Sequence, residues 1–263
     1  MTTLSSYLSI ARDMTRWRSI TAKTPEVTTQ TRYFQDNIGK ATRAEAFVDN
    51  SRLFTYAMKA FGLGDRAYAK GLMKQVLQQG VASPTTLAYK LNDPNILAFA
   101  KAFDFARNGA QTTSSSSLVA SVVDQYTQNA LETDQSTQNG GVGLALYFQR
   151  KAPALGGPYG LLADKKLLQV VQTALDISPM TAAMPIDRQA AMLTKKINIA
   201  DFKDPAKLQS FISRFAAQYD YKYGDASATG SVYSNAILLG ASQDAGGGIG
   251  GSLLQAMQAY RTY

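Results

Sequence analysis

The 263-residue chain contains no cysteine and no histidine. Without cysteine, disulfides, thiolate nucleophiles and cysteine-ligated metals are excluded. Without histidine, the chain lacks the side chain that most often acts as a general base or binds a transition metal. Histidine-bearing triads and zinc sites are therefore excluded. We expect a protein that is not an enzyme, with no catalytic residue, no cofactor-binding residue, no cofactor and no metal site.

Long hydrophobic runs are also missing. No stretch approaches the roughly 18 consecutive apolar residues of a membrane span, so no transmembrane segment is expected. The first residues lack the basic region, apolar core and small-residue cleavage site of a secretory signal. We therefore expect no secretory signal peptide.

The chain is basic, but its lysines and arginines are not clustered. The net charge is +8, yet the densest basic clusters are only Lys165-Lys166 and Lys195-Lys196. No basic stripe is interleaved with aromatic residues in the manner of a base-stacking surface, so no nucleic-acid partner is expected. The net positive charge is explained either by a contribution to solubility or by binding to one acidic protein partner. The sequence does not decide between these two uses.

Helical patterns dominate what is present. Hydrophobic residues make up 45% and charged residues 17% of the chain, which is typical of a folded globular protein. No run of β-branched residues alternates with period two, as a half-buried strand would. The sequence therefore predicts an all-α protein.

The clearest helical pattern lies at residues 47–63, which we interpret as one helix with a definite end. Asn50 is a suitable N-cap, because its side-chain oxygen can accept a free backbone N–H of the first turn. Gly62 and Gly64 end the run, since glycine accepts the left-handed backbone conformation. The apolar residues between cap and end share one helical face: Leu53, Phe54, Ala57, Ala60 and Phe61.

A degenerate second copy of this helix lies at residues 161–177. The offset is 167 − 53 = 114 residues, and Asp164 takes the place of Asn50. Tyr33-Phe34-Gln35 recurs as Tyr147-Phe148-Gln149 at the same offset. The five apolar positions recur as Leu167, Leu168, Val171, Ala174 and Leu175.

Further matches follow at shorter offsets. Asp93-Pro94 recurs as Asp204-Pro205, at 204 − 93 = 111 residues. At an offset of 233 − 126 = 107 residues, the matched residues are Tyr126, Gly140, Val142 and Leu146 with Tyr233, Gly247, Ile249 and Leu253. The common order of these features favours an internal duplication. The alternative is that any two amphipathic helical stretches align this well.

The predicted organisation is two similar tandem helical lobes of about 110 residues, preceded by an N-terminal helix or arm. Its parts are an arm or helix at 1–26, repeat 1 at 27–139, repeat 2 at 140–246 and a closing helix at 247–263. The polar, glycine-bearing stretch Thr133 to Gly141 is the predicted boundary between the lobes.

Both ends of the chain leave alternatives open. Residues 1–24 have a helical apolar spacing and form either a first helix packed on the body or a mobile arm. The last predicted helix either docks back on the body or stays available to another subunit, which leaves a homo-oligomer open.

Two motifs suggest ligand chemistry weakly. Gly246, Gly248 and Gly251 have the spacing G-x-G-x-x-G, but no strand precedes them, so a hinge is the preferred interpretation. Asp201 and Asp204 are three residues apart and could share one cation. A calcium loop needs more oxygen ligands in a fixed register, so we expect these acids to cap a helix.

Two other motifs suggest catalysis weakly. Glu45 and Asp49 are four residues apart, as paired carboxylates would be, but we expect them to face solvent and to favour a helix N-terminus. The run Ser114 to Ser117 has no activating base beside it, so a serine nucleophile is unsupported.

Two sequence blocks carry a family resemblance. Tyr33 to Lys40 has the form Y-x-x-x-N-I-G-K, and Arg52 to Leu63 has the form R-L-F-x-Y-A-x-K-A-F-G-L. Followed by Tyr68-Ala69-Lys70, these blocks resemble the bacterial family known as DUF1217. The resemblance is specific over residues 30–80. It brings no known catalytic residue, so none is transferred.

The resemblance implies a flagellar role, because similar alphaproteobacterial proteins are often encoded among flagellar basal-body, rod and motor genes. It implies flagellar or basal-body proteins as partners, and a location in the cytoplasm or outside it after export through the flagellar apparatus. The first hypothesis is a non-enzymatic protein-interaction protein linked to flagellar assembly or function. The alternative is a small-ligand-binding protein or carboxylate-based enzyme, with carboxylates, tyrosines and lysines converging in a closed pocket with shifted pKa values.

Overall fold

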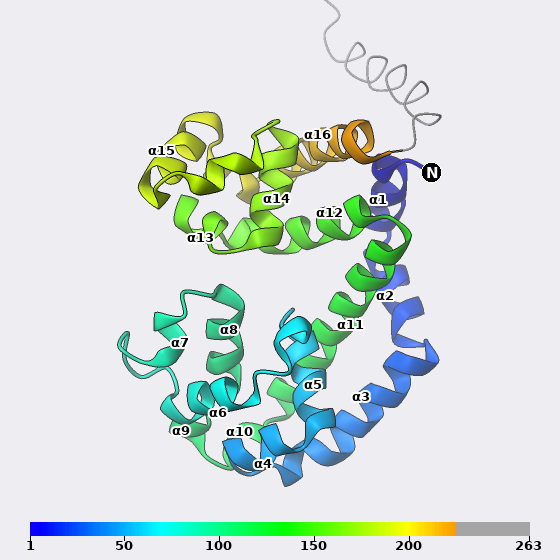
Figure 1. Cartoon of the computed structure of the whole chain (residues 1–263). Helices are drawn as coiled ribbons and strands as arrows, with labels where there is room; N and C mark the ends of the chain where they lie inside the picture. The colour runs from blue at the N-terminus through cyan, green and yellow to red at the C-terminus, as the bar shows by residue number, and fades with distance from the viewer. Residues whose placement is uncertain (225–263) are drawn as a thin grey trace, which may run out of the picture.

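The computed structural model describes residues 1–224, which form helices joined by short turns, with no strand in that range (Figure 1). The all-α prediction is confirmed. Across the same residues, no helix combines the length and the apolar character that crossing a bilayer requires. The predicted closing helix at 247–263, the last part of repeat 2 and the glycine motif at 246–251 lie outside the described residues.

Buried apolar side chains form two separate clusters, and these define two lobes (Figure 1). The first cluster runs from Val27 to Tyr126. The second runs from Leu131 to Phe215 and also includes Tyr7 and Ile10 of the N-terminal helix. The first 24 residues are thus not a separate arm, because they contribute to the core of the second lobe.

The helices divide between the lobes in chain order, apart from the N-terminal pair. The first lobe contains α3 (Pro25–Asn37), η1 (Ile38–Lys40), α4 (Ala44–Asp49), α5 (Ser51–Ala60), η2 (Gly64–Arg66), α6 (Lys70–Gln79), α7 (Leu87–Lys90), α8 (Pro94–Ala102), α9 (Phe105–Asn108) and α10 (Gln111–Ser114). The second lobe contains α1 (Thr3–Arg12), α12 (Gly140–Lys151), η3 (Ala152–Ala154), α13 (Pro158–Leu162), α14 (Lys165–Ala174), η4 (Pro179–Ala183), α15 (Ile186–Lys196), η5 (Ile199–Lys203) and α16 (Pro205–Tyr223). Between the lobes run α2 (Met14–Ala22) and α11 (Ser116–Gln138).

The core of the first lobe is built around one aromatic side chain. Phe47 of α4 is fully buried, and its ring centroid lies 4.7 Å from that of Phe103. The rings of Phe54, Phe99 and Phe105 lie between 5.7 and 6.4 Å away. Offset and edge-on ring contacts of this kind add to the stabilisation from burial itself.

The prediction of one helix over 47–63 is wrong at its start and right at its cap. Asn50 has an extended backbone (φ −74°, ψ 90°), which ends α4 and begins α5. Its side-chain oxygen accepts the N–H of Leu53 at 3.2 Å, as predicted. A residue with non-helical dihedral angles cannot continue a helix, so the capping that was predicted also divides the stretch in two.

The end of α5 is a Schellman turn. Gly62 has a positive φ of 74°, and the N–H of Leu63 donates to the carbonyl of Met58 at 2.8 Å. The end of α14 has the same bond, from Ile177 to Gln172 at 2.8 Å, with Asp176 at φ 51° in the place of the glycine.

A second matching feature joins a tyrosine to each N-cap. In the first lobe, Asn50 Nδ2 donates to Tyr33 Oη at 3.2 Å. In the second, Tyr147 Oη donates to Asp164 Oδ2 at 2.6 Å. In each pair the tyrosine and the N-cap residue are 17 positions apart. Tyr33 and Tyr147 are themselves 114 positions apart, which is the offset of the repeat. These matches favour the internal duplication, which stays a prediction.

The predicted lobe boundary at Thr133 to Gly141 is wrong as a linker. The helix α11 continues to Gln138, and only Asn139 separates it from α12. Within this stretch Gln135 is only 6% exposed, and Glu132, directly before it, is 4% exposed, whereas Thr133, Asp134 and Thr137 are exposed. One helix, α11, therefore contributes to both cores.

The close crossing of α11 and α12 depends on a glycine. A Cβ at Gly143 would lie 1.7 Å from Ser136 Oγ and 2.7 Å from the Glu132 backbone carbonyl oxygen. Serine can turn its hydroxyl away, but the backbone oxygen of a buried helix cannot move as easily.

We expect Gly143→Ala to lower the free energy of unfolding by about 1–3 kcal/mol, because it overpacks this crossing. Chemical denaturation monitored by circular dichroism measures the change. Gly39→Ala is the matched control, since nothing lies within 4 Å of a Cβ placed there. Equal stability of the two variants would contradict the close crossing.

The N-terminus is fastened to the end of the described chain. The backbone N–H of Thr3 lies 3.0 Å from both carboxylate oxygens of Asp220, near the end of α16. The Thr3 hydroxyl also bonds Asn139, whose side chain caps α12 through the N–H groups of Gly141 and Val142. The start of α1, the start of α12 and the last turns of α16 therefore meet at one point.

Candidate functional site

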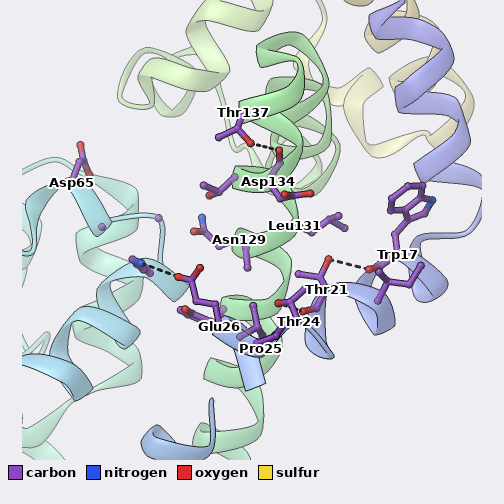
Figure 2. A pocket seen from close by; sticks show the side chains of 18 of the residues that line it. Trp17, Thr21, Thr24, Pro25, Glu26, Asp65, Asn129, Leu131, Asp134 and Thr137 are labelled. Carbon is purple, nitrogen blue, oxygen red and sulfur yellow. Dashed lines mark hydrogen bonds and ion pairs between the residues drawn. The ribbon is translucent and has the colours of Figure 1, made fainter. Parts of the chain in front are cut away.

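An open groove of about 960 Å³ lies along α11 in the described part of the chain (Figure 2). The helix α2 and the start of α3 form one wall. The end of α5 and η2 form the other, and Lys166 at the start of α14 closes one end. The groove therefore lies where the two lobes meet.

The floor of the groove is one stripe of α11. Its residues recur every three or four positions, so they face the same direction on the helix. Asn129 and Ala130 are half-buried, whereas Thr133, Asp134 and Thr137 are exposed. The stripe consists of Tyr126, Asn129, Ala130, Thr133, Asp134 and Thr137. Three of its side chains, those of Ala130, Thr133 and Thr137, are small.

One wall presents apolar surface to solvent. Ile20 is 49% exposed, and Trp17 is half-buried. At the start of α3 the wall continues with the exposed Pro25, whereas Val27 beside it is buried in the core of the first lobe. Such a strip of apolar surface beside a concave floor is typical of a binding surface for another molecule.

The charged residues of the groove are only partly matched with one another. Lys59 and Glu26 face each other across the groove at 4.0 Å. Asp134 accepts hydrogen bonds from the amides of Gln135 and Gln138, at 3.1 and 3.2 Å. Within residues 1–224, neither Asp134 nor Asp65 has a cationic partner within 4.0 Å. The groove therefore offers two carboxylates to a ligand that carries positive charge.

A polar cluster between the lobes lies close to the groove. Asn95 of α8 donates to Tyr147 Oη at 3.4 Å and accepts from Lys151 Nζ at 2.9 Å. Asn95 Nδ2 and Asn129 Nδ2 both lie about 4 Å from the position a Cβ would take on Gly62, which links the cluster to the groove. These contacts tie the first lobe to α12 of the second.

The cluster perturbs its ionisable groups. Burial, and then the charge of Asp164, raise the pKa of Tyr147 well above its ordinary value. Burial, and then the charge of Arg150, lower the pKa of Lys151. Tyr147 and Lys151 are four residues apart on α12, but the phenol already donates to Asp164 at 2.6 Å. Its raised pKa disfavours the phenolate, so this tyrosine is not prepared to act as a base.

A buried ion pair completes the cluster. Arg150 donates two hydrogen bonds to the two carboxylate oxygens of Glu132, both at 2.7 Å. The Glu132 side chain is 5% exposed and also accepts a bond from Gln128 at 3.0 Å. Burial opposes the charge of Arg150, but the bonds and charge of Glu132 outweigh it and raise the pKa of Arg150. The pair fixes α11 against α12.

The acids considered as a cation site have separate roles. Asp204 caps α16 by accepting the N–H groups of Ala206 and Lys207, at 2.8 and 3.2 Å. Asp201 pairs with the Lys207 ammonium at 2.8 Å. The predicted capping role is confirmed for Asp204. Among residues 1–224, no cluster of three or more carboxylates is placed to share a metal ion.

The two weak catalytic motifs also have structural roles. Glu45 of α4 is partly exposed and bonds Gln78 of α6, and Asp49 is exposed and bonds Lys74 of α6. The bond from Gln78 lowers the pKa of Glu45. Ser115 is the N-cap of α11 and accepts the N–H of Leu118 at 3.3 Å.

Sequence patterns did not reveal the groove. The apolar residues of α11 predict a helix, and the floor continues the face of Val119, Val122 and Tyr126 toward the C-terminal half, where most of its residues are polar. A signal was available, because Ala130, Thr133 and Thr137 recur with helical spacing among polar residues. That signal is typical of any solvated helix face, so only the walls identify it as a groove.

Fold and groove together define an all-α protein of two lobes joined by a shared helix, with an open binding surface along that helix. The model of the family described as protein of unknown function (DUF1217) matches residues 60–208. The chain belongs to this family. The sequence resemblance is therefore confirmed.

A solved structure of the same fold supports the assignment. The crystal structure of protein AGR_C_984 from Agrobacterium tumefaciens is similar to this chain with a TM-score of 0.78 and 36% sequence identity. The match covers 84% of this chain and 94% of that one. No curated protein matches this chain.

Proposed function

We propose that this protein is a non-enzymatic scaffold that binds a helical segment of a partner protein in the groove along α11. The observation that carries the proposal is the shape of the groove. A straight floor made by one face of a helix lies between two walls, one of which exposes Trp17 and Ile20. An amphipathic helix laid in an apolar groove is a recurring mode of peptide recognition.

The length of the floor sets the size of the partner segment. The floor runs from Tyr126 to Thr137 of α11, which are 137 − 126 = 11 residue steps apart, and this corresponds to roughly 16 Å at 1.5 Å per residue. A partner helix of about three turns matches this length. Ala130 and Thr133 are small enough to let its side chains approach the backbone of α11.

The charges define the chemistry of the partner helix. Its apolar side chains meet Trp17 and Ile20. Basic side chains at its edges meet Asp65 and Asp134, two carboxylates of the groove that have no cationic partner within 4.0 Å among residues 1–224. Rim charges of this kind contribute more to specificity and association rate than to affinity. We expect partner binding to weaken moderately with added salt.

We place the partner among flagellar proteins, as an assembly factor or a component that contacts the basal body, rod or motor. The support is the resemblance of the Tyr33 to Lys40 and Arg52 to Leu63 blocks, with the flagellar gene context that it implies. The chain would act in the cytoplasm or after export through the flagellar apparatus.

The test combines gene deletion with a groove variant. Thr133→Trp fills the groove from an exposed floor position. We expect it to weaken capture of the partner by about tenfold or more, because the floor is at the centre of the interface, and to impair swimming as deletion does. Ser121→Trp is the matched control, since Ser121 is exposed on the opposite face of the same helix.

Capture is measured by affinity purification from motile cells that carry the variant in place of the normal gene. Normal filaments and normal swimming after deletion would remove the flagellar role. Equal capture by the Thr133 and Ser121 variants would remove the groove as the binding surface.

The ligand-binding or enzymatic alternative has one observation in its favour. Tyr147, Lys151 and Asp164 converge between the lobes, and two of them have shifted pKa values. Their polar atoms bond one another or Asn95, and these three residues do not line the groove. A structural role accounts for these contacts, so we favour the scaffold.

A further inference from the structure

The outer edge of the second lobe exposes apolar side chains that contribute to neither core. This edge is formed by η4, the residues that follow it and the start of α15, on the side of the lobe away from α11 (Figure 1). Met180 is 79% exposed and Ile186 is 52% exposed. The run at 179–186, which we name the apolar tip, contains no charged residue, and only Thr181 in it is polar. Exposed apolar side chains gathered in this way are typical of a surface that docks on another molecule.

The apolar tip has internal partners for its backbone polar groups. Gln189 of α15 donates its side-chain amide to the carbonyls of Ala182 and Met184, at 3.4 and 2.7 Å. Pro179 and Pro185 have no backbone N–H to satisfy. A segment that enters an apolar medium must bring its hydrogen-bond partners with it, because that medium supplies none. The apolar tip meets this condition at these positions.

Cations flank the apolar tip. Arg188, Lys195 and Lys196 of α15 are exposed, and none of them has a carboxylate partner within 4.0 Å among residues 1–224. Residues 178–200 contain these three basic residues and one acid, Asp187, so their net charge is 3 − 1 = +2. Asp187 accepts a hydrogen bond from the Tyr159 hydroxyl at 2.8 Å, so the one acid of this edge is engaged within the lobe.

We propose that the apolar tip and the cations of α15 together dock this protein on the surface of a membrane that contains anionic lipids. Apolar side chains of the tip enter the boundary between headgroups and acyl chains, while the lysines and the arginine stay among the headgroups. Tyr159, which is 54% exposed beside the start of α15, has the amphipathic ring that favours the same depth. Stable peripheral attachment needs two such signals, because one alone binds only marginally.

The charges disfavour a second copy of the chain as the occupant of this edge. In a symmetric contact through the apolar tip, the cations of one α15 would approach those of the other, and like charges at close range oppose association. The phosphate groups of anionic lipids carry the complementary charge instead.

Docking at this edge adds a second surface to the proposed function and does not depend on it. The groove lies along α11, whereas α15 lies at the far side of the second lobe (Figure 1). The groove therefore stays accessible when the apolar tip meets a membrane, and the protein can hold a partner at that membrane surface.

Sedimentation with vesicles tests the docking. The full chain is mixed with vesicles of equal parts phosphatidylglycerol and phosphatidylcholine. We expect Ile186→Asp to lower partitioning onto these vesicles by about tenfold or more, because a buried apolar contact is replaced by a charge. Ile20→Asp is the matched control, since Ile20 is 49% exposed in the wall of the groove, and it should leave partitioning unchanged.

The contribution of the cations is measured separately. We expect Lys195→Gln and Lys196→Gln each to lower partitioning onto the mixed vesicles by about fivefold, and added salt to weaken the binding of the unchanged protein. Binding to vesicles of phosphatidylcholine alone should be weaker and should not respond to these two changes. Circular dichroism of each variant checks that the helices are intact.

A fluorescent label reports whether the apolar tip enters the lipid. Because the chain has no cysteine, Met180→Cys gives one attachment site for a nitrobenzoxadiazole label. We expect its emission to increase and to shift to shorter wavelength with mixed vesicles, and to be quenched by lipids that carry a nitroxide on the acyl chain. Tyr68→Cys is the control, since Tyr68 is 85% exposed on the first lobe, and its label should show neither change.

Three results would overturn the proposal. One is that the unchanged protein does not sediment with the mixed vesicles. Another is an equal loss of sedimentation with Ile20→Asp and Ile186→Asp, which would assign vesicle binding to the groove. The third is a dimer in solution that Ile186→Asp dissociates, without vesicle binding, which would identify a second copy as the occupant. Partner capture that depends on Thr133 is independent of all three, so failure of either proposal leaves the other in place.

Discussion

Replacing Glu132 by alanine is expected to lower the free energy of unfolding by about 2–3 kcal/mol, because it leaves the half-buried guanidinium of Arg150, whose side chain is 29% exposed, without its partner. Arg150 makes both of its 2.7 Å bonds to this carboxylate. The Glu132 side chain is only 5% exposed, so water does not replace it easily. Breaking such a pair costs more than the pair itself contributes, since the remaining charge stays half-buried. Chemical denaturation of the full chain measures the loss.

Two variants control this experiment. Asp134→Ala lies two residues away on α11 but is exposed, and we expect it to change stability by less than about 0.5 kcal/mol. The double variant Glu132→Leu, Arg150→Met removes both charges and should recover most of the stability, because no unpaired charge remains. If the double variant is as unstable as Glu132→Ala, the loss comes from packing rather than from the unpaired charge.

Replacing Phe47 by alanine is expected to destabilise the protein by about 3–5 kcal/mol, through lost burial and the cavity left behind. Phe47 is fully buried, and four other phenylalanine rings surround it. These rings come from three helices of the first lobe: α5, α8 with its C-cap, and α9. The cavity would therefore weaken the packing of the whole lobe. Tyr68→Ala is the control, since Tyr68 is 85% exposed.

The same variant tests whether the lobes unfold together. Trp17 packs against the second core, whereas Phe47 lies in the first. Because α11 belongs to both cores, we expect Trp17 fluorescence and the helical circular dichroism signal to report one shared transition at lower denaturant. Two separate transitions, with that of Trp17 unmoved by Phe47→Ala, would show that α11 does not couple the lobes.

Local features of the fold could be predicted from the sequence. The all-α class followed from apolar residues spaced by three or four, and the caps at Asn50 and Asp164 followed from their side chains. The positive φ of Gly62 followed from the stop it makes. Each of these features depends on residues within one or two helical turns, so the sequence contains the whole of the interaction.

The boundary between the lobes shows where such prediction fails. The polar residues near Thr133 resemble a loop, but Glu132 is paired with Arg150, 18 residues away in the chain. Local polarity therefore predicted a linker, whereas the pairing with Arg150 of α12 stabilises the end of α11 as a helix. The division of the stretch at 47–63 was missed for a different reason. The side chain of Asn50 predicts that a helix begins there, but it does not show that another helix ends directly before it.

The sequence by itself determined that this protein is helical, has no histidine or cysteine chemistry and belongs with sequences of one family pattern. Only the tertiary structure decided that α1 completes the second lobe, that one helix serves both cores and that α2, α5 and α11 enclose a groove. The reason is physical: helix formation and capping act over a few residues, whereas a groove needs surfaces from segments about 40 to 110 residues apart, whose approach depends on how whole helices pack.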